Sequence, residues 1–252
     1  MIPLKDENPT RTRPLVTMVL IGICAVIFFA VQPHDQGVEE ARFSFANAAI
    51  PCEVVHNRAL TETEVVATVG PENDSTACDS SPEGDAAFPG KHPLLAVLYS
   101  MFLHGGLLHL GGNMLFLWIF GNNIEDVFGK VGYLAFYLIG GLVATLAHIA
   151  VQPSSTVPLV GASGAIAAVM GAYLVLFPNA QIRTLFIFIF ILFRDVRAKW
   201  LLGFWFVSQF FTNPAEGVAW MAHVGGFVFG VLVGLVLRNR VQRDPVYVPS
   251  AW

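Results

Sequence analysis

The chain contains 252 residues, of which 55% are hydrophobic and only 13% are charged, with a formal net charge of −4. A mean hydropathy of +0.62 lies outside the ordinary range of soluble globular domains, so the composition excludes that class and indicates a bilayer as solvent. The lipid bilayer is therefore the expected surrounding partner, and we expect no nucleic-acid partner, although the net charge itself says little about partners.

The first apolar stretch covers residues 15–31 and follows an N-terminal segment, residues 1–14, that carries basic side chains. It lacks the small-residue cleavage site of a secretory signal, and further apolar stretches follow, so we expect a retained transmembrane helix. Basic residues also cluster in the second half of the chain and at its end (Arg183, Arg194, Arg197, Lys199, Arg238, Arg240, Arg243). Because excess Lys and Arg marks loops that stay inside, we expect both termini, including the tail at residues 238–252, in the cytoplasm.

The long polar segment at residues 32–93 is expected to be an external loop, because acidic residues crowd it between Asp35 and Asp85. A Thr- and Val-rich patch near Thr61–Val69 suggests a small strand. Cys52 and Cys78 both lie in this loop, on the side expected to be oxidising, so a Cys52–Cys78 disulfide is a hypothesis. Two unpaired loop cysteines are the alternative.

Five more apolar stretches follow, at 107–121 with an apolar approach from Leu94, then at 132–151, 160–177, 198–212 and 218–237. Together they predict an all-α, polytopic membrane bundle of six transmembrane helices. Leu185–Phe193 spans only nine residues and is followed by charged side chains, so we expect it on the inner face or as a short re-entrant piece.

Four polar residues inside these stretches are expected to share one depth. With a cytoplasmic N-terminus and six crossings, the second, fourth and sixth spans all run from outside to inside. His109 and Asn113, Ser163, and His223 lie near the starts of these spans, close to the outer face. Polar residues in a membrane are costly, so they usually mark function or a satisfied helix contact.

Ser163 opens the fourth stretch in Gly161-Ala162-Ser163-Gly164, beside free backbone N–H groups and the positive end of a helix dipole. Such a position suits stabilisation of an oxyanion, although a helix-capping or packing serine is the commoner reason for a lone serine. His223 begins the last span, and Gly226, Gly230 and Gly234 share its helix face, so this face can pack closely on the Gly- and Ala-rich fourth helix. Packing of these two helices would bring the imidazole within reach of the hydroxyl, as a base-activated nucleophile requires.

His109 and Asn113 are one helical turn apart and can both donate hydrogen bonds at the outer end of the second span. They suit either an oxyanion site or a polar clamp between helices. We interpret His104, Glu125 and Asp126 as structural residues that hold loops. No Asp is positioned by the sequence to orient His223, so we expect a dyad, with a packing contact fixing the imidazole tautomer.

These motifs together resemble the rhomboid family of intramembrane serine proteases. The matching pieces are His109-x-x-x-Asn113, Gly161-Ala162-Ser163-Gly164 and Ala222-His223-x-x-Gly226-x-x-x-Gly230, in the family's order, within an expected core at residues 94–237. The resemblance implies Ser163 as nucleophile and His223 as general base, with His109, Asn113 and the Ser163 N–H as the oxyanion hole. It also implies structural roles for His104, Glu125, Gly161, Gly164, Gly226 and Gly230.

The same resemblance implies single-span membrane proteins as substrates, cut near the outer face after a small residue, with no metal or cofactor. The expected form is the bacterial, six-span one, in the plasma membrane. Three features depart from the family's pattern. Phe43–Pro89 is an insertion, the Trp-Arg pair of some members is absent near Tyr99-Ser100, and Ala167 replaces a tyrosine that stacks on the histidine.

Two other functions stay open at this point. A rhomboid-like protein that binds membrane clients without cleaving them normally lacks the serine or the histidine, and both are present here. A transporter could use His109, Asn113 and His223 as an ion path, but the glycine-flanked serine would then have no explanation. A zinc metalloprotease is disfavoured because the sequence contains no His-Glu-x-x-His.

Overall fold

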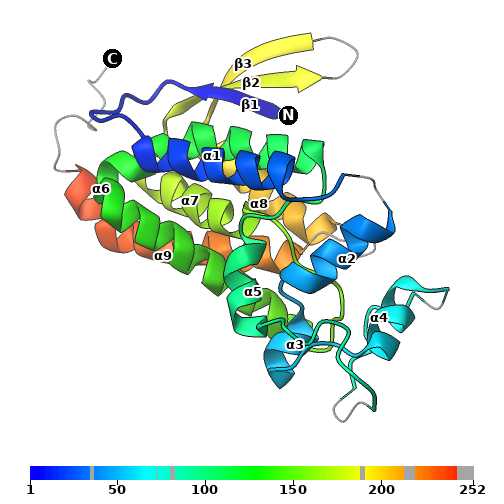
Figure 1. The fold of residues 1–252 in the computed structure, drawn as a ribbon. Helices are drawn as coiled ribbons and strands as arrows, with labels where there is room; N and C mark the ends of the chain where they lie inside the picture. Colours follow the sequence, from blue (N-terminus) through cyan, green and yellow to red (C-terminus); the bar gives the residue numbers. More distant parts are fainter. Residues whose placement is uncertain (35–36, 72, 80–82, 188–190, 213–218, 243–252) are drawn as a thin grey trace.

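The computed structural model describes residues 1–252 except 35–36, 72, 80–82, 188–190, 213–218 and 243–252 (Figure 1). The elements in chain order are β1 (Ile2–Asp6), α1 (Leu15–Ala30), α2 (Val38–Asn47), α3 (Pro51–His56), α4 (Glu62–Val69), α5 (Pro93–Ser100), α6 (Leu107–Val151), α7 (Ser163–Leu176), β2 (Gln181–Ile187), β3 (Ile191–Arg197), α8 (Ala198–Ser208), η1 (Gln209–Phe211) and α9 (Trp220–Gln242). The chain is therefore mostly helical. The predicted start of the sixth span at residue 218 and the tail from residue 243 lie outside the described residues.

Helix α6 contains 45 residues but is broken at Gly129, where φ is 70° and ψ is 163°. A left-handed φ of this kind is natural only for glycine, and it divides α6 into two segments that contain the predicted second and third spans. The predicted approach from Leu94 is a separate short helix, α5. Among the described helices, α6 and residues 220–239 of α9 are long and apolar enough to cross a membrane, while α1 and α7 are apolar but shorter.

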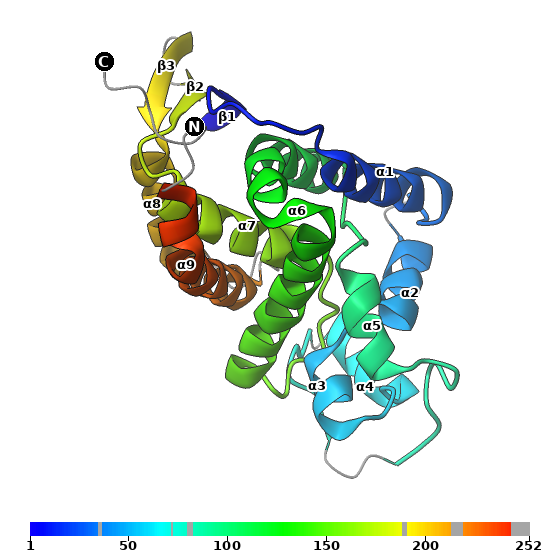
Figure 2. The same cartoon turned by 90° about the vertical axis from the view of Figure 1, so that its left-hand side faces the viewer.

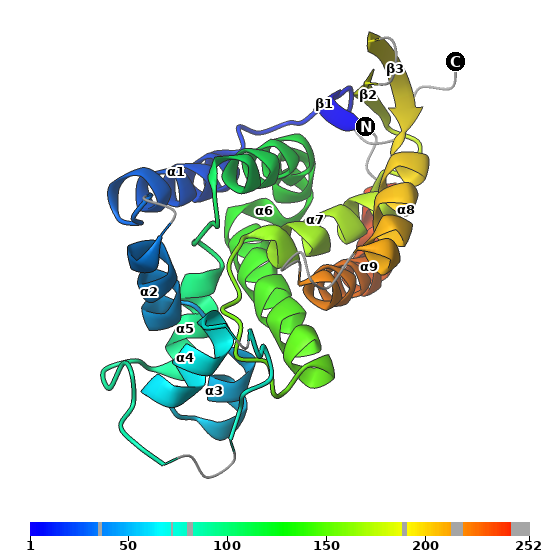
Figure 3. The same cartoon turned by 90° about the vertical axis from the view of Figure 1, so that its right-hand side faces the viewer.

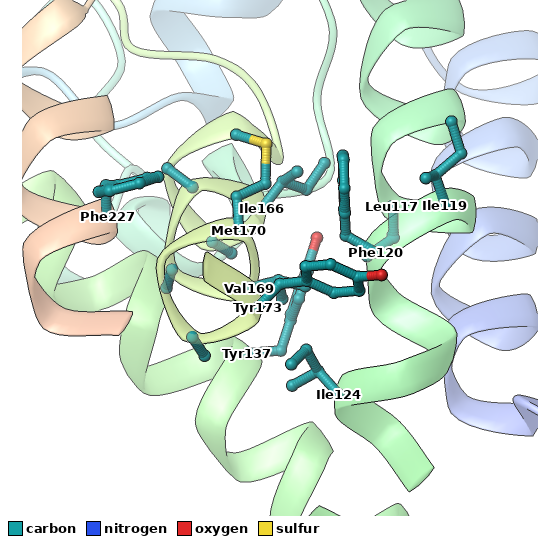
Figure 4. Packing of buried hydrophobic residues seen from close by; sticks show 14 of the residues in the cluster. Leu117, Ile119, Phe120, Ile124, Tyr137, Ile166, Val169, Met170, Tyr173 and Phe227 are labelled. Carbon is teal, nitrogen blue, oxygen red and sulfur yellow. The ribbon is translucent and has the colours of Figure 1, made fainter. Parts of the chain in front are cut away.

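Helix α7 lies at the centre of the bundle, between α6 on one side and α8 and α9 on the other (Figures 2 and 3). Its side chains are buried around most of its circumference because it has neighbours on several faces. Figure 4 shows Ile166, Met170 and Tyr173 of this helix packed between Phe120 and Tyr137 of α6 and Phe227 of α9. Large apolar side chains of the outer helices stay exposed, among them Phe29, Leu146 and Val236. This distribution is natural for a bundle that is surrounded by lipid.

Small residues bring α7 and α9 into backbone contact. A Cβ atom added at Gly226 would overlap the carbonyl oxygen of Gly164, and one added at Gly230 would overlap that of Ala168. At Gly171 an added Cβ would overlap the carbonyl oxygen of Phe227 on the opposite helix. Close approach of this kind maximises van der Waals contact where both helices are in an apolar solvent.

The described parts of Leu185–Phe193, residues 185–187 and 191–193, lie in two β-strands, a conformation that the prediction of an inner-face or re-entrant piece did not specify. Strand β2 pairs antiparallel with β1, with Ile2 opposite Leu185, and with β3, with Gln181 opposite Arg197. The resulting three-stranded sheet has the order β1-β2-β3. The prediction of an all-α fold did not include this sheet. The segment is rich in Ile and Phe, which favour strands, and pairing satisfies its backbone groups.

The segment predicted as an external loop, residues 32–93, contains three short helices, α2 to α4, which lie with α5 at the end of the molecule opposite the sheet (Figures 1 and 3). Phe45, Ile50 and Leu60 form its small core, and a disulfide joins Cys52 to Cys78. The predicted strand at Thr61–Val69 was wrong. The segment is helix α4, whose start is fixed by a capping box between Thr61 and Glu64.

Candidate active site

Ser163 is the first residue of α7 and follows an irregular segment, residues 152–162. The backbone N–H of Gly161 donates to the carbonyl oxygen of Ser100 at 2.9 Å, which ties this segment to the end of α5. Gly161 has a φ of +130°, and a Cβ atom there would lie 2.9 Å from the imidazole of His109. Glycine is therefore required both by the backbone conformation and by the space that His109 fills.

His223 lies in the first turn of α9, and its Nε2 is 2.8 Å from Ser163 Oγ. The two residues are 60 positions apart, and the backbone contact between α7 and α9 brings them together. The ring is held from a second side by Trp205 of α8, with ring centroids 5.7 Å apart. Ala167 does not supply this contact, since its side chain is buried in the core of the bundle.

Gln209, which the sequence interpretation missed, contacts the other ring nitrogen of His223. Its Oε1 lies 2.7 Å from His223 Nδ1, and its Nε2 donates to the carbonyl oxygen of Trp205 at 2.9 Å. A signal for it existed, because Gln209 is a polar residue inside the predicted fifth span at 198–212, and such residues are costly in a membrane.

His109 lies close to Gly161, two residues before Ser163. The backbone N–H of Gly105 donates to His109 Nδ1 at 3.3 Å, so a neutral His109 carries its proton on Nε2. A Cβ atom added at Gly161 would lie 2.9 Å from His109 Nε2 and 3.5 Å from Ser163 Oγ. An N–H donor and the serine oxygen thus flank the same small space.

Asn113, one turn further along α6, is buried, and its Nδ2 has no hydrogen-bond partner in the described part of the chain. Buried amides nearly always have a partner, so an unused donor here calls for an explanation. A ligand oxygen within reach of this nitrogen would supply one.

A cavity of about 30 Å³ adjoins the serine. Small side chains dominate its wall, including Gly141, Ala144, Gly164 and Ala222, with Thr145 as a polar member. This volume is two to three times the ~10–15 Å³ that one water molecule requires, so the cavity has room for a small substituent.

Of the remaining predicted structural residues, His104 lies near this site, while Glu125 and Asp126 contact the start of α1. His104 is buried in the loop before α6, where Gln32 both donates to its carbonyl and accepts from its backbone N–H, and its ring lies 5.3 Å from that of His109. Glu125, far from the serine, accepts from the backbone N–H groups of Val16 and Thr17, which start α1. Asp126 likewise accepts from the backbone N–H of Thr12.

The fold and these residues define an integral membrane protein with a partly buried serine–histidine pair. Residues 91–240 match the Rhomboid domain, which is more than half of the chain. The chain belongs to the rhomboid family.

Three relatives illustrate the similarity. "Rhomboid protein 1, mitochondrial" of Saccharomyces cerevisiae is 31% identical over 60% of this chain and 44% of its own length. "RHOMBOID-like protein 5" of Arabidopsis thaliana is 32% identical over 60% of this chain and 48% of its own length, and "Rhomboid-related protein 2" of Mus musculus is 30% identical over 60% and 51%. The chain thus spans about half the length of the curated relatives it matches. All three come from eukaryotes, so they lend no support to the expected bacterial form.

Proposed function

We propose that the protein is an intramembrane serine endopeptidase that uses a Ser163–His223 dyad. The observation that carries the proposal is the 2.8 Å contact between Ser163 Oγ and His223 Nε2 at the packed ends of α7 and α9. A histidine acceptor at hydrogen-bond distance can remove the hydroxyl proton as the oxygen attacks, which a serine outside such a pair cannot achieve at neutral pH. Family membership supports the same reaction class.

The reaction proceeds through an acyl-enzyme. Ser163 Oγ attacks the scissile carbonyl carbon while its proton moves to His223 Nε2, and the protonated imidazole then gives that proton to the departing amine. In the second half, His223 accepts a proton from a water molecule, which attacks the ester carbonyl. The proton returns to Ser163 Oγ as the new carboxyl terminus leaves, so the enzyme is restored.

His109 Nε2–H, Asn113 Nδ2–H and the backbone N–H of Ser163 are the proposed donors to the oxyanion of the tetrahedral intermediate. The support is that the first two are unused donors in the described structure, while Ser163 opens a helix whose first N–H groups have no intrahelical acceptor. Donors held in place before the reaction stabilise the developing charge without reorganisation.

The proposed substrates are single-span membrane proteins cut near the outer face of the membrane, after a small residue. The small volume of the cavity beside Ser163 supports that preference. We further propose six crossings, formed by α1, the two segments of α6, α7, α8 and α9, with both termini and the β-sheet on the cytoplasmic side and α2 to α5 outside. The kink at Gly129, which divides the longest helix into two spans, supports this number.

A fluorophosphonate probe tests the proposal directly. Wild-type protein in detergent is compared with Ser163→Ala and His223→Ala, and each is also incubated in liposomes with a model transmembrane substrate. We expect labelling and cleavage by the wild type and neither by the two variants. Equal labelling of wild type and Ser163→Ala would reject the nucleophile. A folded wild type that is neither labelled nor active would favour binding of membrane clients without cleavage.

A further inference from the structure

We propose that Gln209 is a positioning residue for the reaction and holds His223 in the tautomer that carries its proton on Nδ1. This inference rests on the proposed function, because the tautomer matters only if His223 acts as a base toward Ser163. It adds to the dyad a neutral third member from a different helix.

The hydrogen bonds around Gln209 fix the direction of its amide. The carbonyl oxygen of Trp205 can only accept, so the group that faces it at 2.9 Å must be the NH₂ of Gln209. The amide oxygen is then the atom 2.7 Å from His223 Nδ1. This oxygen can also only accept, so Nδ1 must be the protonated nitrogen.

The consequence at the opposite side of the ring is a free lone pair on Nε2. That nitrogen lies 2.8 Å from Ser163 Oγ, so the serine hydroxyl donates to it. In the alternative tautomer, Nε2–H would point at the serine, and two lone pairs would face each other between Nδ1 and Gln209. The local hydrogen bonds therefore select the state in which His223 can remove a proton.

The surrounding residues hold the side chains of Gln209 and His223 in this arrangement. Gln209 is 6% exposed and lies in η1, directly after α8, where Ser208 Oγ accepts a second hydrogen bond from its NH₂ at 3.2 Å. Trp205 packs against the imidazole, which limits rotation of the ring. The ionisable side chains that interact electrostatically with His223 are His109 and His148, and no carboxylate in the described part of the chain bonds to it.

A neutral acceptor suits this location. An ionised carboxylate in an apolar bundle would carry a desolvation cost of several kcal/mol, whereas an amide oxygen carries only a dipole. The amide still stabilises the imidazolium that forms during attack, because Nδ1–H keeps its acceptor throughout. The cost is weaker stabilisation of the charged ring than a carboxylate would give.

Two substitutions separate positioning from packing. Gln209→Leu keeps the bulk and removes the acceptor, and we expect the labelling rate and kcat to fall about 10- to 100-fold with little change in KM. Gln209→Glu restores an acceptor and adds charge. We expect it to recover activity and to move the acidic limb of the pH–rate profile to higher pH by about one unit or more, because a carboxylate favours the protonated ring. Val207→Ala, an exposed residue in the preceding turn, is the matched control.

Nitrogen-15 NMR of labelled histidine gives a readout that does not depend on activity. We expect the neutral His223 of the wild type to show a protonated Nδ1, and Gln209→Leu to show a mixture of tautomers. A wild-type His223 protonated on Nε2, or a Gln209→Leu variant with wild-type rate, pH profile and tautomer, would overturn the role of Gln209. Failure of the proposed function looks different, because the wild type itself would then be unlabelled and inactive while the spectrum still reports the tautomer.

Discussion

At the scale of single residues, the unused donor of Asn113 has the clearest consequence for rate. A buried amide nitrogen without a partner costs about 1–3 kcal/mol, and a transition-state oxygen would recover that cost only during the reaction. We expect Asn113→Ala to lower kcat by about 10²–10³-fold, the usual effect of removing one oxyanion donor. The measurement is turnover of a transmembrane substrate in liposomes.

Asn47→Ala, which removes a side-chain amide from α2 on the external side, is the control and should leave kcat unchanged. His109 is a second proposed donor to the oxyanion, so it can lessen the effect of the Asn113→Ala substitution. A double variant, His109→Ala with Asn113→Ala, removes both. Undiminished turnover in this double variant would refute the proposed oxyanion site.

The four candidate residues could be predicted from the sequence because each is a polar side chain in an apolar stretch. Gln209 was not predicted, although it also lies in an apolar stretch. Its proposed role depends on a contact with His223, which lies 14 residues further along the chain in the next helix, α9. Periodicity places residues on one helix face, but it does not report where two helices meet.

At the scale of elements, the backbone contact between α7 and α9 decides whether the serine and the histidine meet. We expect Gly230→Ala to push the helices apart, because the added methyl group would overlap the carbonyl oxygen of Ala168. Overlap with backbone cannot be relieved by a rotamer change, so the expected cost is about 1–3 kcal/mol of stability together with loss of activity. Thermal unfolding in detergent and probe labelling measure the two effects.

The matched control is Gly22→Ala in α1, where an added Cβ meets no atom within 4 Å. Alanine has the higher helix propensity, so this variant should be at least as stable as the wild type. Equal stability and labelling of Gly230→Ala and Gly22→Ala would show that the close contact of α7 and α9 is not required.

Helix positions followed from apolar length, while one short segment was left without a predicted conformation and another was assigned wrongly. A continuous apolar run such as Leu185–Phe193 fits a strand or a piece of helix equally well, and the partner that decides, β1, lies at the other end of the chain. Thr61–Val69 was assigned by its Thr and Val content, although Thr61-Glu62-Thr63-Glu64 carries the capping-box pattern that starts a helix.

At the scale of the whole molecule, Asp6 links the N-terminal strand to the bundle. Its carboxylate accepts from the hydroxyl of Tyr173 in α7 at 3.0 Å and from the side-chain amide of Asn123 in α6. Burial raises the pKa of Asp6 from 3.8 to about 6. The folded state therefore binds a proton more readily than the unfolded chain. The free energy of unfolding consequently rises as the pH falls from about 6 to about 4, and this contribution is absent above about pH 6.

We expect Asp6→Asn to be more stable than the wild type at pH 7.5, by a few degrees in Tm, because the amide has no charge to bury. The difference should shrink toward pH 5, where the wild-type carboxyl is protonated. Asp85→Asn makes the same chemical change at an exposed carboxylate that does not interact with Asp6, and it serves as the control. Parallel pH profiles of Tm for wild type and Asp6→Asn would contradict the role given to Asp6.

The order in which the chain is made gives the position of His223 a further meaning. Ser163 is synthesised 60 residues before His223, and α9, which carries the histidine, is the last helix in the described part of the chain. A nascent chain that has inserted α7 but not α9 therefore holds the proposed nucleophile without its proposed base. The Ser163 hydroxyl gains its histidine partner only when α9 has docked, so under the proposed function activity would depend on completed assembly of the bundle.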